Sequence, residues 1–420
     1  MEAGLGRRFR LMWSAAVASA LGSGVVTIAA PLLVASRTSD PLMVSAVSVA
    51  AWLPWLLFVL PGGVLVDRGD RRLLMIWIDW ARVAAVGVLA VAVATGRAGT
   101  WLILVVLFVV GTGEAVFRSA SQALVPALVP RDLLERANGW LLGGVTLMQS
   151  MVGGPLGGLL FVLAASLPFF VNAGTYAVSA VLIMLVAGAY RAVPGVAGAP
   201  VAGAGPARRS VRAEVVEGFR WLVRQRVLRT MAVLIGLLNV TLTAALAVLV
   251  LLARERLHLG SVGYGLLFTS MAVGGILGSV VGDRLIVRVG ATWTIRAGLL
   301  IEAGLHLTLA ASRSAYLVGF AFLAFGVHNS LWNIVGASLR QRLTPPHMLG
   351  RVGSTTLFIA TAGNCVGAVL GGALATRFGI TAPYWVGFGA AVLVSATTWH
   401  VFDRATMSAT YAVDYSASGS

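Results

Sequence analysis

Long runs of apolar residues, separated by short polar segments, fill the sequence from residue 11 to residue 402. Each run reaches about 20 residues, the length that an α-helix needs to cross about 30 Å of hydrocarbon. The runs predict twelve transmembrane helices, over residues 11–34, 42–66, 73–95, 100–122, 139–164, 168–190, 227–252, 262–282, 291–311, 314–338, 352–376 and 381–402. Between the sixth and seventh runs, residues 193–206 are rich in Gly, Ala and Pro and predict a linker, followed by an amphipathic helix over 210–226.

Composition supports an all-α membrane protein. Hydrophobic residues make up 58% of the 420-residue chain and charged residues only 11%, with a mean hydropathy of +0.90. A soluble domain carries about 25% charged residues, so this chain has too few to cover a water-exposed surface. Its 50 glycines suit helices that pack closely in lipid.

The net charge of +16 comes from arginine alone, since the sequence contains no lysine. The arginines form short clusters between apolar runs, and most fall in loops on the side of the N-terminus, whereas Arg37, Arg97, Arg254, Arg256, Arg313 and Arg377 fall on the other. The positive-inside rule then predicts cytoplasmic termini. A nucleic-acid partner is not expected, because no basic stripe with interleaved aromatic residues occurs outside the spans.

The N-terminus imitates a secretory signal peptide. Arg7, Arg8 and Arg10 precede an apolar stretch that contains the A-x-A triplet Ala18-Ser19-Ala20. Hydrophobicity continues to Val34, however, so we expect an uncleaved first helix.

The two halves of the chain repeat at a single offset. Pro130 and Pro345, Arg136 and Arg351, Gly63 and Gly278, and Gly157 and Gly372 are each 215 positions apart (345 − 130, 351 − 136, 278 − 63, 372 − 157). Two parallel six-helix bundles related by an axis along the membrane normal are predicted, an arrangement suited to alternating access. The expected domains are residues 1–190, a cytoplasmic linker with its helix over 191–226, a second bundle over 227–403, and a tail over 404–420.

The loop between the second and third spans carries a motif, Gly63-Val-Leu-Val-Asp67-Arg68-Gly-Asp70-Arg71-Arg72. It resembles the signature loop of the major facilitator superfamily, G-x-L-x-D-R-x-G-R-[K/R], with Asp70 in place of the usual glycine. The resemblance implies the major facilitator fold, a small-molecule substrate, no cofactor and function as a single chain. It also implies a gating role for Gly63, Asp67, Arg68, Arg71 and Arg72, and we hypothesise that Asp67 holds Arg118 in the inward gate.

Further strings resemble one branch of that superfamily. Gly154, Pro155, Gly157 and Gly158 in the fifth span are similar to the G-P-x-x-G-G motif of antiporters. Segments 118–138, 217–221 and 341–352 look like the macrolide-efflux and enterobactin-exporter proteins. This resemblance implies proton-driven export of a drug-like, antibiotic or siderophore-like compound from a bacterial plasma membrane.

Ionisable residues inside spans are functional candidates, because burying charge in lipid costs several kcal/mol. In the family fold, spans one, four, seven and ten line the cavity. Glu114 lies on span four, and Asn329 is its repeat mate on span ten (114 + 215), so we expect the two to face each other across the cavity. Glu114 is therefore the candidate proton carrier, since burial disfavours its charged form. The alternative is a static ion pair between Glu114 and Arg118 at i+4.

Other intramembrane charges have structural interpretations. Asp79 and Arg82, at i and i+3 on span three, are expected to form a snorkelling ion pair, and Glu302 and His306, at i and i+4 on span nine, a structural pair. The candidate substrate cavity comprises Trp52, Gln149, Asn239, His328, Asn329 and Trp332.

Two other function classes remain as alternatives. A proton-coupled importer of a metabolite is disfavoured by the antiporter-like motif. A non-transporting membrane sensor or an enzyme is disfavoured because H-E-x-x-H, G-x-S-x-G and phosphate-binding glycine loops do not occur. No metal is expected, and the single Cys365 excludes a cysteine-based metal cluster.

Overall fold

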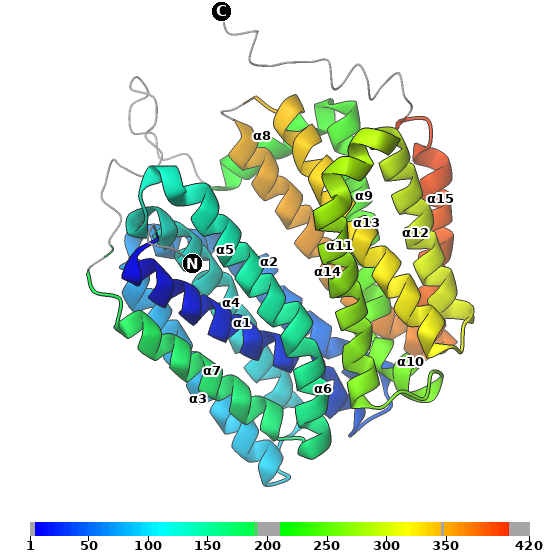
Figure 1. Ribbon diagram of the computed structural model, residues 1–420. Helices are drawn as coiled ribbons and strands as arrows, with labels where there is room; N and C mark the ends of the chain where they lie inside the picture. The colour runs from blue at the N-terminus through cyan, green and yellow to red at the C-terminus, as the bar shows by residue number, and fades with distance from the viewer. Residues whose placement is uncertain (1–4, 189, 191–210, 346–347, 403–420) are drawn as a thin grey trace, which may run out of the picture. The chain divides into compact units, whose positions relative to one another are not determined.

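The computed structural model describes residues 5–188, 190, 211–345 and 348–402, and its regular elements are helices (Figure 1). The side chains of residues 59–64, 67, 68, 131 and 211–216 are not described. The expected linker over 193–206 and the expected tail over 404–420 also lie outside the described residues.

Helices of the first half follow the predicted spans closely. They are α1 (Gly6–Ala35), α2 (Pro41–Arg68), α3 (Arg71–Ala94), α4 (Thr100–Leu128), α5 (Leu134–Thr146), α6 (Gly153–Leu163) and α7 (Leu167–Met184). A short 3₁₀ turn over Arg131–Leu133 precedes α5, and a π-helical turn over Leu147–Val152 joins α5 to α6. The fifth predicted span is thus one helix with an irregular centre.

The second half begins with α8 (Val211–Arg224), which occupies the place of the predicted amphipathic helix. The remaining helices are α9 (Arg226–Ala247), α10 (Leu249–Glu255), α11 (Ser261–Val289), α12 (Ala291–Ala311), α13 (Ala315–Leu343), α14 (Leu349–Phe378) and α15 (Ala382–Thr398). The seventh predicted span is divided between α9 and α10 at Val248.

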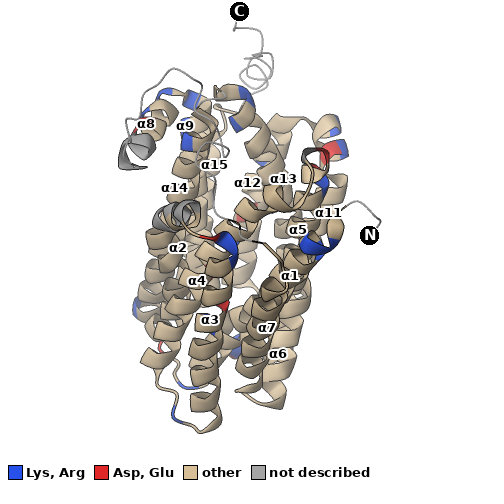
Figure 2. Ribbon diagram, turned by 90° about the vertical axis from the view of Figure 1, so that its left-hand side faces the viewer, with Lys and Arg blue, Asp and Glu red and all other residues tan. Residues whose placement is uncertain are grey.

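Eleven helical segments among the described residues are at least 18 residues long and apolar enough to cross a membrane. The twelfth predicted span is occupied by α15, which has 17 residues. Figure 2 shows the long helices without Asp, Glu, Lys or Arg over most of their length, with arginines gathered at helix ends. This pattern is that of a multi-pass membrane protein.

The chain divides into two compact units. The first comprises Met1–Thr38, Val49–Arg208 and Gly260–Thr269, and the second Ser39–Ser48, Arg209–Leu259 and Ser270–Ser420. In the first unit, α1 packs against α6 and α7, and α3 packs against α4 and α7. In the second unit, α9 packs against α14 and α15, and α12 packs against α13 and α15. Span for span, these are the same four pairs, so the sequence repeat at offset 215 is also a repeat of helix packing.

Glycines set the closest helix contacts of the first unit. A Cβ on Gly157 of α6 would lie 2.5 Å from the carbonyl oxygen of Val25 on α1, and a Cβ on Gly153 would lie 2.8 Å from Cα of Gly24. Real side chains do not fit at such distances, so the two backbones touch because both helices present glycine.

Pro155 explains the π-helical turn that precedes α6. Proline has no N–H, so the carbonyl four residues earlier, that of Met151, receives no helical hydrogen bond from it. Met151 lies inside the turn over Leu147–Val152. The irregular backbone therefore accompanies the antiporter-like motif in sequence, and π-turns of this kind often occur at functional sites.

Candidate functional site

Three charged side chains from α3 and α4 meet inside the first unit: Asp79, Arg82 and Glu114. We call this group the Arg82 cluster. Arg82 Nη2 lies 3.4 Å from Oδ1 of Asp79, and Arg82 Nη1 lies 3.2 Å from Oε2 of Glu114. Arg82 also donates to Ser19 Oγ at 3.2 Å and to the carbonyl oxygen of Gly113 at 3.3 Å. One guanidinium thus connects α1, α3 and α4.

Aromatic rings and a hydroxyl complete the surroundings of the Arg82 cluster. The guanidinium carbon lies 4.9 Å from the ring centre of Phe117 and 4.5 Å from that of Tyr176. Ser23 Oγ donates to Glu114 Oε2 at 3.0 Å and lies 3.1 Å from the Tyr176 hydroxyl. Ser23 and Tyr176 were not among the residues selected from the sequence, where a single hydroxyl in an apolar helix gives little signal.

The expected ion pair between Asp79 and Arg82 is confirmed. The expectation that the pair snorkels toward the membrane surface is wrong, because both side chains are buried. Arg82 is 1% exposed and Asp79 is 0% exposed. The guanidinium turns inward because two carboxylates and two ring faces take the place of headgroup water. Gly113 leaves the necessary room, since a Cβ there would lie 2.8 Å from Nε of Arg82.

Glu114 pairs with Arg82 rather than with the expected alternative, Arg118. The Arg118 side chain is exposed, and its guanidinium carbon lies 5.9 Å from the ring centre of Trp55. Helical spacing in the sequence pointed to Arg118 at i+4 as the partner of Glu114. The packing of α3 on α4 instead brings Arg82, which lies 32 positions earlier in the sequence. The Glu114 side chain keeps 19% exposure, so it is the accessible member of the cluster.

The loop motif between α2 and α3 is described only in part. Asp67 and Arg68 lie outside the described side chains, as does Gly63, so the hypothesised Asp67–Arg118 gate stays a prediction. Arg71 Nη1 donates to the Ala123 carbonyl at 2.8 Å. Arg72 donates from Nε and Nη2 to the carbonyls of Ile183 and Met184 at 3.1 and 2.6 Å. These arginines bind backbone carbonyls near the C-terminal ends of α4 and α7.

Asp70, which replaces the glycine of the family motif, caps α3. Its Oδ1 accepts hydrogen bonds from the backbone N–H groups of Arg72 at 3.0 Å and Leu73 at 3.2 Å. Its Oδ2 accepts from the N–H of Tyr190 at 3.2 Å. The departure from the motif therefore supplies a helix cap, a position at which aspartate is favoured.

The antiporter-like motif lies at the start of α6. Gly154, Gly157 and Gly158 are buried, and Pro155 is partly buried. Gly157 makes the backbone contact with α1 given above. The motif therefore acts in this unit as a close-packing surface beside a π-helical turn.

The residues predicted to line a substrate cavity lie in different surroundings. Trp52 is 37% exposed, Gln149 lies in the π-helical turn, and Asn239 Nδ2 donates to the Ile235 carbonyl at 2.7 Å. Asn329 is exposed, and its carbonyl oxygen accepts from Asn333 Nδ2 at 2.7 Å. Glu114 and Asn329 belong to different units, so their facing each other across a cavity stays a prediction.

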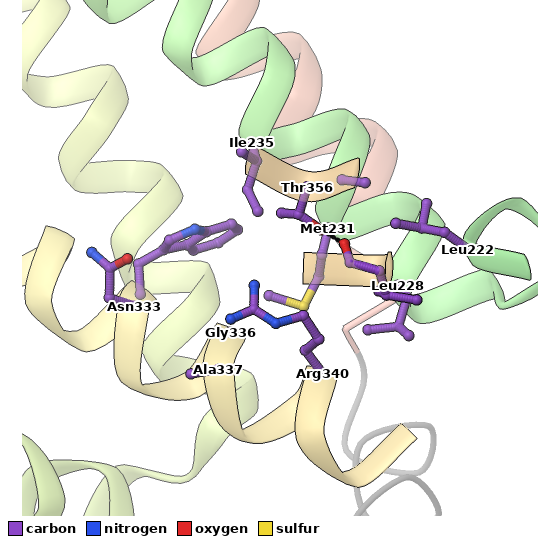
Figure 3. A pocket seen from close by; sticks show the side chains of 12 residues that line it. Leu222, Leu228, Met231, Ile235, Asn333, Gly336, Ala337, Arg340 and Thr356 are labelled. Atoms are coloured by element: carbon purple, nitrogen blue, oxygen red, sulfur yellow. Dashed lines mark hydrogen bonds between the residues drawn. The ribbon is translucent and has the colours of Figure 1, made fainter. Parts of the chain in front are cut away.

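The second unit contains a cavity of about 260 Å³ between α8, α9, α13 and α14 (Figure 3). Its walls are mainly apolar, with three polar side chains, Asn333, Thr356 and Arg340; the other lining residues are Leu222, Leu228, Met231, Ala232, Ile235, Trp332, Gly336, Ala337 and Val352. Figure 3 shows the Arg340 side chain rising from α13 toward Met231. An apolar cavity with few polar groups suits an amphipathic molecule. Of the predicted cavity residues, Trp332 lines it.

Glu302, His306 and His328 form a second buried group, the Glu302 cluster. His306 Nε2 lies 3.5 Å from Oε1 of Glu302, and His328 Nε2 lies 4.0 Å from Oε2. The predicted pairing of Glu302 with His306 is confirmed, and α13 adds His328, which is 4% exposed. Within the described part of the chain, no group of three His, Cys, Asp or Glu side chains is arranged to hold a metal ion.

In the part of the chain that the structure describes, two helical units with repeated packing and buried charges inside apolar spans have the architecture of a membrane transporter of the major facilitator superfamily. The chain belongs to the transmembrane secretion effector family of that superfamily, whose model matches residues 5–417. The relatives described below are transporters rather than enzymes.

Sequence relatives include efflux proteins. Macrolide efflux protein A of Streptococcus pyogenes is 30% identical over 133 residues, which is 32% of this chain and 33% of that protein. The chain therefore spans about a third of the length of that relative. The multidrug efflux pump Tap of Mycolicibacterium fortuitum is 26% identical over 399 residues, covering 89% of this chain and 90% of the pump.

Solved structures share the fold. A bacterial homologue of the iron transporter ferroportin, in an inward-facing state, superposes with a TM-score of 0.73 at 17% identity, covering 96% of this chain and 100% of that one. The nucleoside transporter NupG gives a TM-score of 0.66 at 12% identity, covering 97% of this chain and 100% of that one. At these identities the likeness shows the fold, and the two names differ in substrate.

Proposed function

We propose that this transporter exports an amphipathic organic compound, of the drug, antibiotic or siderophore kind, by alternating access driven by proton entry. The family description, transmembrane secretion effector, and the names of the macrolide and multidrug efflux relatives support export. The bacterial plasma membrane is the proposed location, with both termini cytoplasmic and the protein acting as a monomer among lipids.

The Arg82 cluster is the observation that carries the proton-coupling proposal. With both carboxylates ionised, one guanidinium faces two negative charges, so the group has a net charge of −1. A buried net charge is costly in a low-dielectric interior. One proton brings the net charge to zero, and Glu114 is the member that keeps access at 19% exposure.

Protonation of Glu114 changes how the first unit is held together. A neutral carboxyl binds the guanidinium less strongly than a carboxylate does. The contact between Arg82 Nη1 and Glu114 Oε2, at 3.2 Å, joins α3 to α4, and Ser23 joins the same oxygen to α1. Proton uptake therefore loosens three helices of one bundle together, which gives the transport cycle a two-state element.

Substrate and proton exchange by competition in this mechanism. Glu114 takes up a proton from outside, substrate leaves, and the proton departs inward when new substrate binds. The cavity in Figure 3 suits an aromatic or aliphatic compound with a hydrogen-bonding group, because Arg340, Asn333 and Thr356 are its polar positions among mainly apolar walls.

The runner-up is a proton-coupled importer of a metabolite. Packing of the antiporter-like motif against α1, with the π-helical turn beside it, favours export by resemblance to antiporters. The direction of pH dependence separates the two. With protons entering in both cases, acid outside drives substrate outward in an exporter and inward in an importer.

The test is efflux from cells lacking their own drug pumps, measured with ethidium and with erythromycin over a range of external pH. We expect wild-type efflux to rise as external pH falls, and Glu114→Gln to lose this dependence. The matched control is Glu135→Gln, a carboxylate exposed on α5. Undiminished pH-driven efflux by Glu114→Gln would remove the role assigned to Glu114.

A further inference from the structure

The side chains of the Glu302 cluster are buried together in the interior of the second unit. Its three titratable side chains come from two helices, α12 and α13, and are 2% (Glu302), 0% (His306) and 4% (His328) exposed. Neither nitrogen of His306 has a hydrogen-bond partner among the described residues. Nε2 faces Oε1 of Glu302 at 3.5 Å, whereas Nδ1 faces no hydrogen-bond partner among the described residues.

Two glycines shape the space that the imidazoles occupy. A Cβ on Gly298 of α12 would collide with the His328 ring, and a Cβ on Gly387 of α15 would collide with the His306 ring. Each imidazole therefore lies against a helix backbone where only glycine fits. The two rings converge on Glu302 because the three helices pack closely around it.

The net charge of the Glu302 cluster depends on how many protons its imidazoles hold. Among the described residues, the basic nitrogens within 4.0 Å of the Glu302 carboxylate belong to the two imidazoles. The cluster has a net charge of −1 with both imidazoles neutral, zero with one proton and +1 with two. An isolated carboxylate is costly at membrane depth, and a single proton within the cluster would cancel its net charge.

The surrounding helices bring few other charges. On α12, Arg296 donates to the Trp399 carbonyl at 2.8 Å and lies over the Trp399 ring. On α15 the titratable side chain is Tyr384, three positions before Gly387. On α13 the others are Tyr316, Arg340 and Arg342, near its ends. Helix α9 has none after Arg229, and α11 has none between Tyr264 and Asp283.

His328 connects the Glu302 cluster to the cavity of the second unit. The His328 ring lies edge-on to Trp332, one turn later on α13, with 6.1 Å between ring centres and 63° between planes. Trp332 lines the cavity. A positively charged imidazolium interacts with an indole more strongly than a neutral imidazole does. A proton on His328 would therefore alter its contact with a residue in the wall of the cavity.

We infer that the Glu302 cluster is a second proton-binding site, in the C-terminal bundle, that couples proton occupancy to the cavity through His328 and Trp332. The inference rests on the proposed function of proton-driven export. The proposed site lies on α12 and α13, which the repeat relates to α3 and α4, but its chemistry differs from that of the Arg82 cluster. In the first unit a cation on span three meets an anion on span four, and in the second an anion on span nine meets a titratable base on span ten.

The first experiment detects the proton without transport. The protein is labelled with ¹⁵N-histidine, embedded in lipid nanodiscs and followed by NMR between about pH 5 and pH 8, where histidine ordinarily titrates. We expect the signals of His306 or His328, assigned by single His→Gln variants, to move with pH and to change in Glu302→Gln. The exposed His400 is the internal control and should be unaffected by that variant. Signals from both buried imidazoles that stay constant over this range would overturn the inference.

The second experiment places the site in the transport cycle. In proteoliposomes, Glu302→Gln and His328→Gln should reduce the ratio of ethidium efflux at acidic over neutral external pH to about half or less of the wild-type ratio, with His400→Gln as the control. Wild-type ratios in both variants would overturn the coupling. Absence of pH-driven efflux in wild-type protein would instead refute the proposed function, while the NMR result would still decide whether the cluster binds protons.

Discussion

Replacing Arg82 by methionine tests the Arg82 cluster most directly. Methionine keeps much of the side-chain length but leaves the Asp79 and Glu114 carboxylates without their shared cation. Arg82 contacts both carboxylates at 3.4 and 3.2 Å, and also two hydrogen-bond acceptors and two ring faces. The substitution removes every one of these contacts at once.

The magnitude follows from the burial of these groups. Removing one partner of a buried ion pair costs about 3–5 kcal/mol, which at the lower limit is about a 150-fold change in the folding equilibrium. Protonation of the carboxylates limits the loss, because a neutral carboxyl needs no cation. We therefore expect Arg82→Met to be less destabilising at acidic than at mildly alkaline pH.

The assay is unfolding of the purified protein by increasing sodium dodecyl sulfate, followed by loss of helical signal at both pH values. Asp79→Asn in the Arg82→Met background should restore part of the lost stability, since it removes one of the two unpaired carboxylates. Arg118→Met is the matched control. It loses one exposed ring contact at 5.9 Å and should cost about 1 kcal/mol or less. Equal stability of Arg82→Met and wild type at mildly alkaline pH would refute the account of the cluster.

Two further substitutions test the packing and the cap. Gly157→Ala should destabilise the folded protein by about 1–3 kcal/mol, because its Cβ would lie 2.5 Å from the Val25 carbonyl oxygen. The control is Gly174→Ala, since no atom lies within 4 Å of a Cβ at that position. Equal effects of the two substitutions in the same unfolding assay would contradict the close contact. Asp70→Ala should cost about 1 kcal/mol by removing the α3 cap, whereas Asp70→Asn keeps an acceptor oxygen and most of the stability, so equal losses would argue against capping.

Membrane architecture could be predicted from the sequence because its signals are local. A helix that crosses lipid needs only a long enough apolar run, so the predicted span over 291–311 matches α12 residue for residue. The repeat at offset 215 predicted two related bundles, and the matched helix pairs agree with it. The i, i+3 pairing of Asp79 with Arg82 and the i, i+4 pairing of Glu302 with His306 followed from helical spacing within one helix.

Contacts between helices could not be predicted in this way. Sequence spacing offered Arg118 as the partner of Glu114, and only the packing of α3 on α4 made Arg82 the partner instead. His328 was expected to contact substrate, yet α13 carries its ring to Glu302. Which side chains share a buried site depends on the rotation and separation of neighbouring helices. Those are set by contacts spread over the whole interface, such as the glycine contacts of α1 with α6, so tertiary structure alone decided the composition of both charged clusters.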